Sequence, residues 1–254
     1  MKRNLTALAL ATVLLLSGCG GNDSGKTQTA SQPTQEAAPE NTAPSDTPVQ
    51  VPEKSAEPDK TEDHVLSSLE ASVDGGRVLT LCAIGKQRAD MDQWGVREVR
   101  VYEGDTLLQT ISVQEAIDAD GVDGIDTGYT QCWSAEEAMS VEDLNFDGSG
   151  DLDLFGWIPA SNTVPHYYWL WDSGSNSYRY ALCLQGASVD AQAQEIVSQY
   201  HYEKGVDYTD YYAPDDSGNL VLVRREIADW TQGDGQAPLV TVYTVENGQL
   251  TLAQ

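Results

Sequence analysis

The stretch YYWLWDSGSNSYRYAL, residues 167–182, decides the fold class of this chain. Its first part is an aromatic and aliphatic run, and its last part has tyrosines alternating with other residues. Ser173-Gly174-Ser175-Asn176 lies between these two runs. Aromatic runs favour strands, and a short segment of Ser, Gly and Asn between two such runs is typical of a β-hairpin. The stretch therefore predicts two antiparallel strands joined by a tight turn.

Three large rings lie on one face of the first predicted strand: Tyr167, Trp169 and Trp171 are spaced two residues apart. A row of this kind can stack on sugar rings. Aromatic side chains at a spacing of two belong more often to a hydrophobic core. We therefore favour a core position for this row.

Strand-like runs separated by turn residues continue on both sides of the hairpin and predict an all-β domain. The expected architecture is one or more twisted antiparallel sheets, or a β-sandwich-like meander, with one short helix. Strands are predicted at 69–73, 77–84, 96–102, 106–113, 167–171, 177–182, 196–202, 220–226, 239–245 and 249–252. The helix is predicted at 135–139, because Ser134 and Glu137 have the spacing of a capping box.

The N-terminus has the pattern of an export signal. Met1-Lys2-Arg3 is followed by an apolar run at 5–16, which is too short to span a bilayer as a helix. Leu16-Ser17-Gly18-Cys19 resembles the lipobox of bacterial lipoproteins. That resemblance implies cleavage after residue 18, acylation of Cys19 and anchoring to the bacterial cell membrane, facing the exterior or the periplasm. The alternative is that Cys19 merely lies near an ordinary cleavage site.

Composition divides the rest of the chain into two regions. Residues 20–63 hold six of the ten prolines and no aromatic residue, so we expect residues 19–63 to be a lipidated cysteine followed by a disordered linker. Residues 64–254 hold all 20 aromatic residues and form the predicted globular domain, whose formal charge is 9 − 31 = −22. Such an acidic chain repels phosphate backbones, which argues against nucleic-acid binding.

Three cysteines remain besides Cys19: Cys82, Cys132 and Cys183. Three is an odd number, so at most one disulfide can form within the chain, and the spacing does not choose the pair. Buried, unreacted thiols are an equally good interpretation.

The segment from Asp143 to Asp151 carries the clearest chemistry in the sequence. Oxygen-bearing side chains recur at alternate positions and a glycine follows the third of them, in the pattern D-x-N-x-D-G-x-x-D. Calcium takes six to eight hard oxygen ligands, and a tightly coiled loop can direct alternate residues toward one ion. The predicted ligands are Asp143, Asn145, Asp147, Ser149 through its carbonyl, and Asp151. The alternative is an Asx-rich turn that binds no metal.

This loop differs from an EF-hand at its end. Leu154 occupies the position of the bidentate glutamate, and the residues after Asp151 read as a strand instead of an exiting helix. The segment resembles the calcium loops found in integrin-type and similar β repeats, which implies a mainly structural ion.

A wider resemblance covers roughly residues 140–250. The calcium-loop segment 141–148, the aromatic strand 167–172 and the later runs 220–226 and 240–243 resemble a group of bacterial lipoproteins. A known representative is a periplasmic immunity protein that inhibits a lysozyme-like effector of a type IV secretion system. Membership would imply a twisted β fold like that of the periplasmic lysozyme inhibitors. Some such inhibitors insert a Ser-Gly loop with a nearby Tyr into the enzyme's cleft; the segment 173–178 is a looser version, and we favour an ordinary hairpin turn for it.

Enzyme motifs do not stand out. The sequence contains no G-x-S-x-G, P-loop or H-E-x-x-H motif, and His64, His166 and His201 are isolated from one another. The acidic run Asp118, Asp120, Asp123 and Asp126 lacks a ligand order and reads as a solvated loop. We therefore expect a non-catalytic calcium-binding module, either an inhibitor of a lysozyme-like hydrolase or an immunity protein. The alternatives are a cell-wall or glycan-binding lipoprotein and a glycan-directed hydrolase.

Overall fold

The computed structural model describes residues 62–88, 92–120, 128–159, 163–232, 236–246 and 248–253. The chain divides into two units, Met1–Glu53 and Lys54–Gln254, and all described residues belong to the second. The predicted signal peptide, Cys19 and the predicted linker up to residue 61 lie outside the described residues. Within the described ranges, none of the helices has the length and apolar character needed to cross a membrane.

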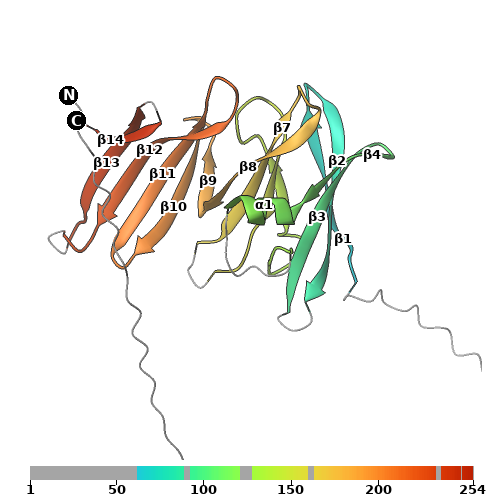
Figure 1. Ribbon diagram of the computed structural model, residues 1–254, viewed down its shortest axis with the longest axis horizontal. Coiled ribbons are helices and arrows are strands. Elements are labelled where there is room, and N and C mark those ends of the chain that lie inside the picture. Colours follow the sequence, from blue (N-terminus) through green and yellow to red (C-terminus); the bar gives the residue numbers. More distant parts are fainter. Residues whose placement is uncertain are drawn as a thin grey trace, which may run out of the picture. The chain divides into compact units, whose positions relative to one another are not determined.

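The first sheet follows chain order and is antiparallel throughout (Figure 1). Its strands are β1 (His64–Val73), β2 (Arg77–Arg88), β3 (Gln93–Glu103) and β4 (Thr106–Ser112). Side chains at every second position of β2, Leu79, Leu81 and Ala83, are fully buried. This period of two places one face of the sheet against the core.

The second sheet contains the aromatic hairpin quoted first. Its strands are β5 (Met139–Glu142), β6 (Asp151–Phe155), β7 (Pro165–Asp172) and β8 (Ser177–Gln185), again in chain order. Strand β7 lies between two cores. Tyr167, Trp169 and Trp171 belong to the larger core, shared with the first sheet, whereas Tyr168 and Leu170 belong to a smaller one. All five are at most 4% exposed, so the aromatic row is core, as favoured.

The third sheet has six antiparallel strands in chain order, orange to red in Figure 1. They are β9 (Ala187–Asp190), β10 (Glu195–Glu203), β11 (Val206–Pro214), β12 (Leu220–Asp229), β13 (Leu239–Glu246) and β14 (Gln249–Leu252). The smaller core takes Ile196 and Leu220 from this sheet. Leu239 and Leu252, on the last two strands, are more than half exposed.

The all-β meander is therefore confirmed, with three strands that the sequence did not indicate. Strands β5 and β9 have only four residues each, too few for a periodic signal. Strand β11 reads VDYTDYYAP, and its two aspartates and terminal proline weakened the strand pattern.

The predicted helix at 135–139 is wrong. The predicted capping contact forms, because the Glu137 amide donates to the Ser134 hydroxyl at 3.2 Å. The turn nevertheless stops there, since the Ala138 carbonyl accepts from the Phe155 amide at 3.0 Å and Met139 begins β5. Strand pairing has overridden a local helix signal.

The helix of the described residues is α1 (Val113–Asp120), directly after β4. Its buried residues Val113, Ala116 and Ile117 have helical spacing. The expected solvated loop is thus wrong for Asp118 and Asp120, which belong to this helix, while Asp123 and Asp126 lie outside the described residues.

Two local features join the three sheets. The Gln109 side chain, on edge strand β4, donates to the Tyr178 carbonyl at 2.7 Å and accepts from the Tyr178 amide at 2.8 Å. Gly186 is the one residue between β8 and β9. Its φ is 53°, and a β-carbon built on it would lie 2.4 Å from the Gln199 carbonyl oxygen, so this link requires glycine.

Candidate calcium-binding loop

The predicted calcium loop connects β5 to β6, and Asp151 is the first residue of β6. The element after the loop is a strand, as predicted. Leu154, at the position of the EF-hand glutamate, is fully buried in the larger core and offers no ligand. The loop is a structured connection within the second sheet.

The first half of the loop coils around the carboxylate of Asp143. Its two oxygens accept from the backbone amides of Asp147 and Gly148, each at 3.0 Å. Gly148 has a φ of 88°, which glycine adopts without a steric penalty. Phe146 has a φ of 61°, a strained value for an aromatic residue. The backbone therefore makes the tight turn that the sequence predicted around Gly148.

The centre of the loop contains Asn145 and Asp147. The Asp147 amide donates to the Asn145 side-chain oxygen at 3.3 Å, and the Asp147 carboxylate accepts from the Ser149 amide at 2.7 Å. The Asn145 side-chain amide also donates to the Gly218 carbonyl at 3.3 Å. This last bond connects the loop to the turn between β11 and β12, a contact that the sequence did not predict.

Asp151 is the most buried member of the set. Its side chain is inaccessible to solvent, and its two oxygens accept from the backbone amides of Leu144 and Trp171 at 2.9 and 2.8 Å. Burial raises the pKa of Asp151 to about 7, although its hydrogen bonds from backbone amides oppose the shift. Asp151, at the end of the loop, is thus bonded both to the start of the loop and to β7.

The loop is anchored to neighbouring strands as well. The Gly150 amide donates to the Ser72 carbonyl at 2.7 Å, and the Tyr178 hydroxyl donates to the Gly150 carbonyl at 2.8 Å. A β-carbon at Gly150 would lie 2.8 Å from a Val141 methyl group, so the chain passes too close for a larger residue.

The five predicted ligands lie in one loop, but the carboxylates of this loop are not directed at a common point. Across the described ranges, no group of three or more His, Cys, Asp or Glu side chains is arranged to hold a metal ion. The carboxylates of Asp143, Asp147 and Asp151 point at amides instead. Within the same ranges, none of the three forms an ion pair with Lys, Arg or His.

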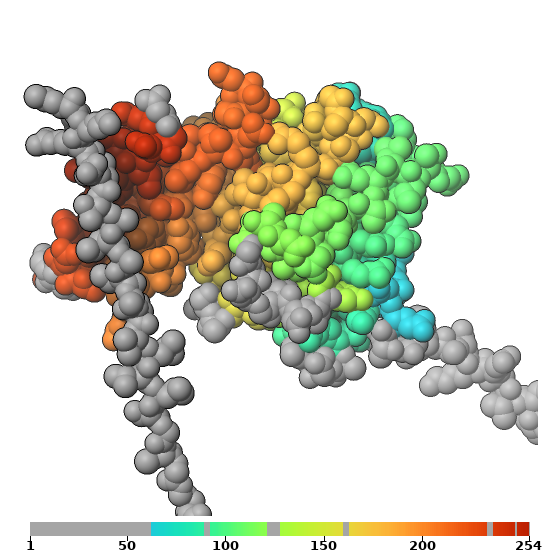
Figure 2. Space-filling model, viewed as in Figure 1, coloured from blue at the N-terminus to red at the C-terminus, as the bar shows by residue number. Residues whose placement is uncertain are grey.

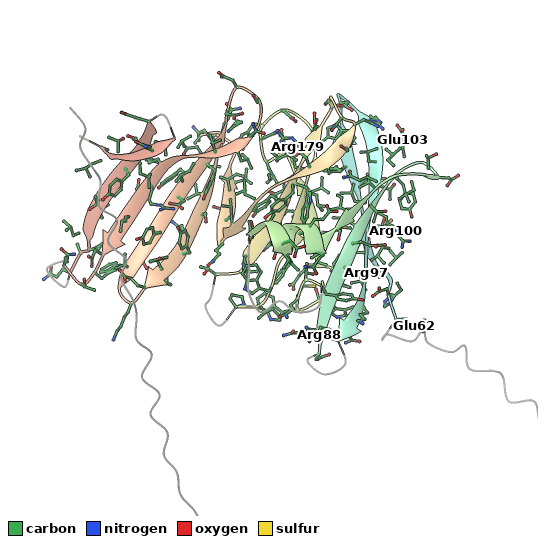
Figure 3. The ribbon with its side chains drawn as sticks, in the orientation of Figure 1. Glu62, Arg88, Arg97, Arg100, Glu103 and Arg179 are labelled. Carbon is green, nitrogen blue, oxygen red and sulfur yellow. The ribbon has the colours of Figure 1, made fainter. Side chains whose placement is uncertain are left out.

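A second polar cluster holds the hairpin turn at 173–176, which lies beside the β1–β2 turn (Figure 2). Asp74 accepts from the Ser173 hydroxyl and, at 3.1 Å, from the Trp171 indole. Arg77 donates to Asn176 and, at 2.6 Å, to Glu103, which Figure 3 labels at the end of β3.

These contacts explain two shifts in acidity. The Ser173 hydrogen bond is the main cause of the lowered pKa of Asp74, and the Arg77 hydrogen bond is the main cause of the lowered pKa of Glu103. The segment is a hairpin turn between β7 and β8 that is fixed to the first sheet.

The histidines and cysteines occupy structural positions. His166 bonds to the Asp153 carboxylate at 2.6 Å, His201 pairs with Asp207, and His64 bonds to the Glu62 carbonyl at 2.9 Å. Cys82, Cys132 and Cys183 are all free thiols. Burial raises the pKa of the Cys132 thiol to about 12 and raises that of Cys183 further still.

No family model matches this chain, and no curated protein matches it. Among solved structures, a Xanthomonas type IV secretion system related protein is similar with a TM-score of 0.49 and 14% identity, over 76% of this chain and 98% of that one. A Bacteroides fragilis protein of unknown function is similar with a TM-score of 0.23 and 9% identity, over 74% and 89% of the two chains. Both TM-scores lie below 0.5.

Proposed function

We propose that this protein is an exported, membrane-anchored calcium-binding lipoprotein. Its β domain acts as a non-catalytic binding module, and its partner is a lysozyme-like hydrolase. The proposal has three parts, calcium binding, partner binding and anchoring, and each has its own test.

The charge of the loop at 143–151 is the observation that carries the calcium proposal. Three carboxylates lie within nine residues, one of them fully buried, and no basic side chain of the described residues neutralises them. Each carboxylate oxygen has two lone pairs, and a backbone amide uses one of them. The remaining lone pairs, with the Asn145 oxygen and the Ser149 carbonyl, supply the hard oxygen donors that calcium takes.

The calcium proposal is tested by thermal unfolding of the full chain, stripped of metal and then titrated with calcium. At a calcium concentration a hundred times Kd, mass action adds about 2.7 kcal/mol. That corresponds to a rise in Tm of roughly 5–11 °C for a domain of this size. Asp147→Ala should abolish the rise, and Asp105→Ala, an exposed carboxylate in the β3–β4 turn, should leave it intact. Magnesium should substitute poorly, since it demands stricter octahedral geometry. A wild-type Tm that ignores millimolar calcium would show that the loop is only a turn.

The partner proposal rests on charge and on the resemblance of residues 140–250 to the immunity lipoproteins. A domain with a formal charge of −22 is complementary to a basic protein surface. A hydrolase of an acidic wall polymer is drawn to its substrate by positive charge, so it is a partner of the required sign. Purified protein should inhibit at least one enzyme in a panel of muramidases, with inhibition that weakens as salt rises. Absence of inhibition and of binding across the panel would refute this part.

A glycan-directed hydrolase is the competing function. Two carboxylates, those of Glu142 and Asp153, line a hollow of about 290 Å³ that is the candidate location for it. Asp153 is already bonded to His166 and, at 3.2 Å, to the Ser140 hydroxyl, which favours a structural role. Hydrolysis of peptidoglycan by the purified chain, lost in both Glu142→Gln and Asp153→Asn, would replace the binding module with an enzyme.

Anchoring is tested separately by growing cells with a radioactive fatty acid. The wild-type chain should incorporate the label and the Cys19→Ala variant should not. Label retained by the variant would contradict the lipobox assignment.

A further inference from the structure

A cluster of tyrosines on the third sheet is independent of the calcium loop. Tyr200 on β10 and Tyr208 on β11 are direct cross-strand partners, and their rings stack with centroids 5.5 Å apart and planes 16° apart. The Tyr202 ring lies 5.4 Å from that of Tyr208. We call Tyr200, Tyr202 and Tyr208 the tyrosine platform. Tyr202 is 72% exposed, so a large part of its ring is open to solvent.

A buried ion pair contacts two rings of the platform, Tyr200 and Tyr208. Arg225 on β12 donates to both carboxylate oxygens of Asp210, each at 2.6 Å, and the Asp210 side chain is only 2% exposed. The Tyr200 hydroxyl donates to Asp210 at 3.1 Å and accepts from Arg225 at 3.2 Å. The Arg225 guanidinium also lies 5.2 Å from the centroid of the Tyr208 ring. Two of the three rings are thus held in place before any ligand arrives.

The register of the β10–β11 hairpin shifts at the third ring. His201 pairs with Asp207 and Glu203 with Val206, so Tyr202 has no direct cross-strand partner. Irregularities of this kind occur often beside binding sites. An aromatic side chain that is 72% exposed gains little from folding, which leaves its ring available for contact with another molecule.

A hollow of about 360 Å³ opens beside the platform. Tyr200 and Tyr202 line it together with Ser198, Asp210, Arg225 and the exposed Gln185. Within the described ranges, the side-chain amide of Gln185 makes no hydrogen bond and so offers both donors and an acceptor. The volume is at the lower end of the range for small-molecule sites.

We propose that the tyrosine platform and this hollow bind an uncharged saccharide. A pyranose has an apolar C–H face that packs on an aromatic ring, which the platform supplies. Its hydroxyls need donors and acceptors nearby, and the residues lining the hollow supply these. The formal charge of −22 disfavours anionic sugars. A cationic peptide is the other candidate, but Asp210 is the acidic residue lining the hollow and Arg225 already neutralises it.

Isothermal titration calorimetry of the full chain with the N-acetylglucosamine tetramer and with cellotetraose tests the proposal. At least one saccharide should bind the wild-type chain. Tyr202→Ala should raise Kd about tenfold or more. Tyr202→Phe keeps the ring, so its Kd should stay within about threefold of the wild-type value. Trp133→Ala is the matched control, because Trp133 is an exposed aromatic residue (54%) outside the platform and should leave Kd unchanged.

Three results would overturn the proposal. They are the absence of wild-type binding to both saccharides, equal losses in Tyr202→Ala and Trp133→Ala, and binding of tetralysine at this site in place of the saccharides. Circular dichroism of each variant confirms that the fold is kept. None of these readouts involves calcium or a muramidase, so a negative result here leaves the function proposed above standing.

Discussion

Replacing Arg225 by methionine should destabilise the domain through the carboxylate it leaves behind. Arg225 supplies two bonds of 2.6 Å to Asp210, whose side chain is 2% exposed, and without them the Tyr200 hydroxyl remains its donor. Removing one partner of a buried ion pair costs about 3–5 kcal/mol. Because the Arg225 side chain is 24% exposed, water will enter and the lower figure, about 3 kcal/mol, is expected. For a domain of this size the corresponding fall in Tm is roughly 6–12 °C.

Guanidinium unfolding followed by tryptophan fluorescence measures this loss directly. The double variant Arg225→Met with Asp210→Leu should recover stability to within about 1.5 kcal/mol of wild type, since no charge is then left buried. Arg100→Met is the matched control, because Arg100 is 40% exposed in its pair with Glu98 and its loss should lower the free energy of unfolding far less. If Arg225→Met lowers the free energy of unfolding no more than Arg100→Met does, the Arg225–Asp210 pair does not stabilise the third sheet.

Three further outcomes are expected. Asp74 and Glu103 have pKa values lowered in the folded protein, so their contribution to stability is present above the unfolded values near pH 4 and is lost as the pH falls below them. Asp74→Asn should therefore make the loss of unfolding free energy between pH 5 and 2.5 shallower than in wild type. A steeper loss would contradict this. Gly186→Ala combines a positive φ with a steric clash, whereas at Gly104 φ is also positive but a β-carbon meets nothing within 4 Å. Gly186→Ala should therefore lower the free energy of unfolding more than Gly104→Ala does. Equal losses would show that the clash at Gly186 has no effect. Iodoacetamide at pH 8 should leave the buried Cys132 unmodified in the native protein and label it in guanidinium, as mass spectrometry would show, and rapid native labelling would mean that its burial is incomplete.

Periodicity predicted the sheets well because alternation depends on local sequence. Most predicted runs are strands, and the aromatic row at 167–171 is buried in the core, as its spacing of two residues predicted. The same local reasoning failed at residues 135–139, where a capped turn competes with pairing between β5 and β6. It also missed α1, although Val113, Ala116 and Ile117 have helical spacing, because the apolar signal is only eight residues long.

The sequence located the loop at 143–151 but not its surroundings. Gly218, Trp171 and Ser72 bond to loop residues that are at least twenty positions away in the sequence, and nothing in the local pattern indicates such partners. The tyrosine platform was missed for the same reason. Tyr202 and Tyr208 flank a turn, but the contacts of Tyr200 and Tyr208 with Arg225 and Asp210 depend on the register of three strands.

The single glycine between β8 and β9 has a consequence for how such a chain can be divided during evolution. Domains are usually exchanged or extended at exposed linkers where few contacts cross. Here the joint is one residue long, and Gly186 itself donates to the Val164 carbonyl and accepts from the Gln199 amide. Recombination at this point would have to cut hydrogen-bonded structure and uncover Tyr168 and Leu170 of the smaller core. The second and third sheets are therefore expected to be inherited together, with insertions accumulating in the turns and not at their junction.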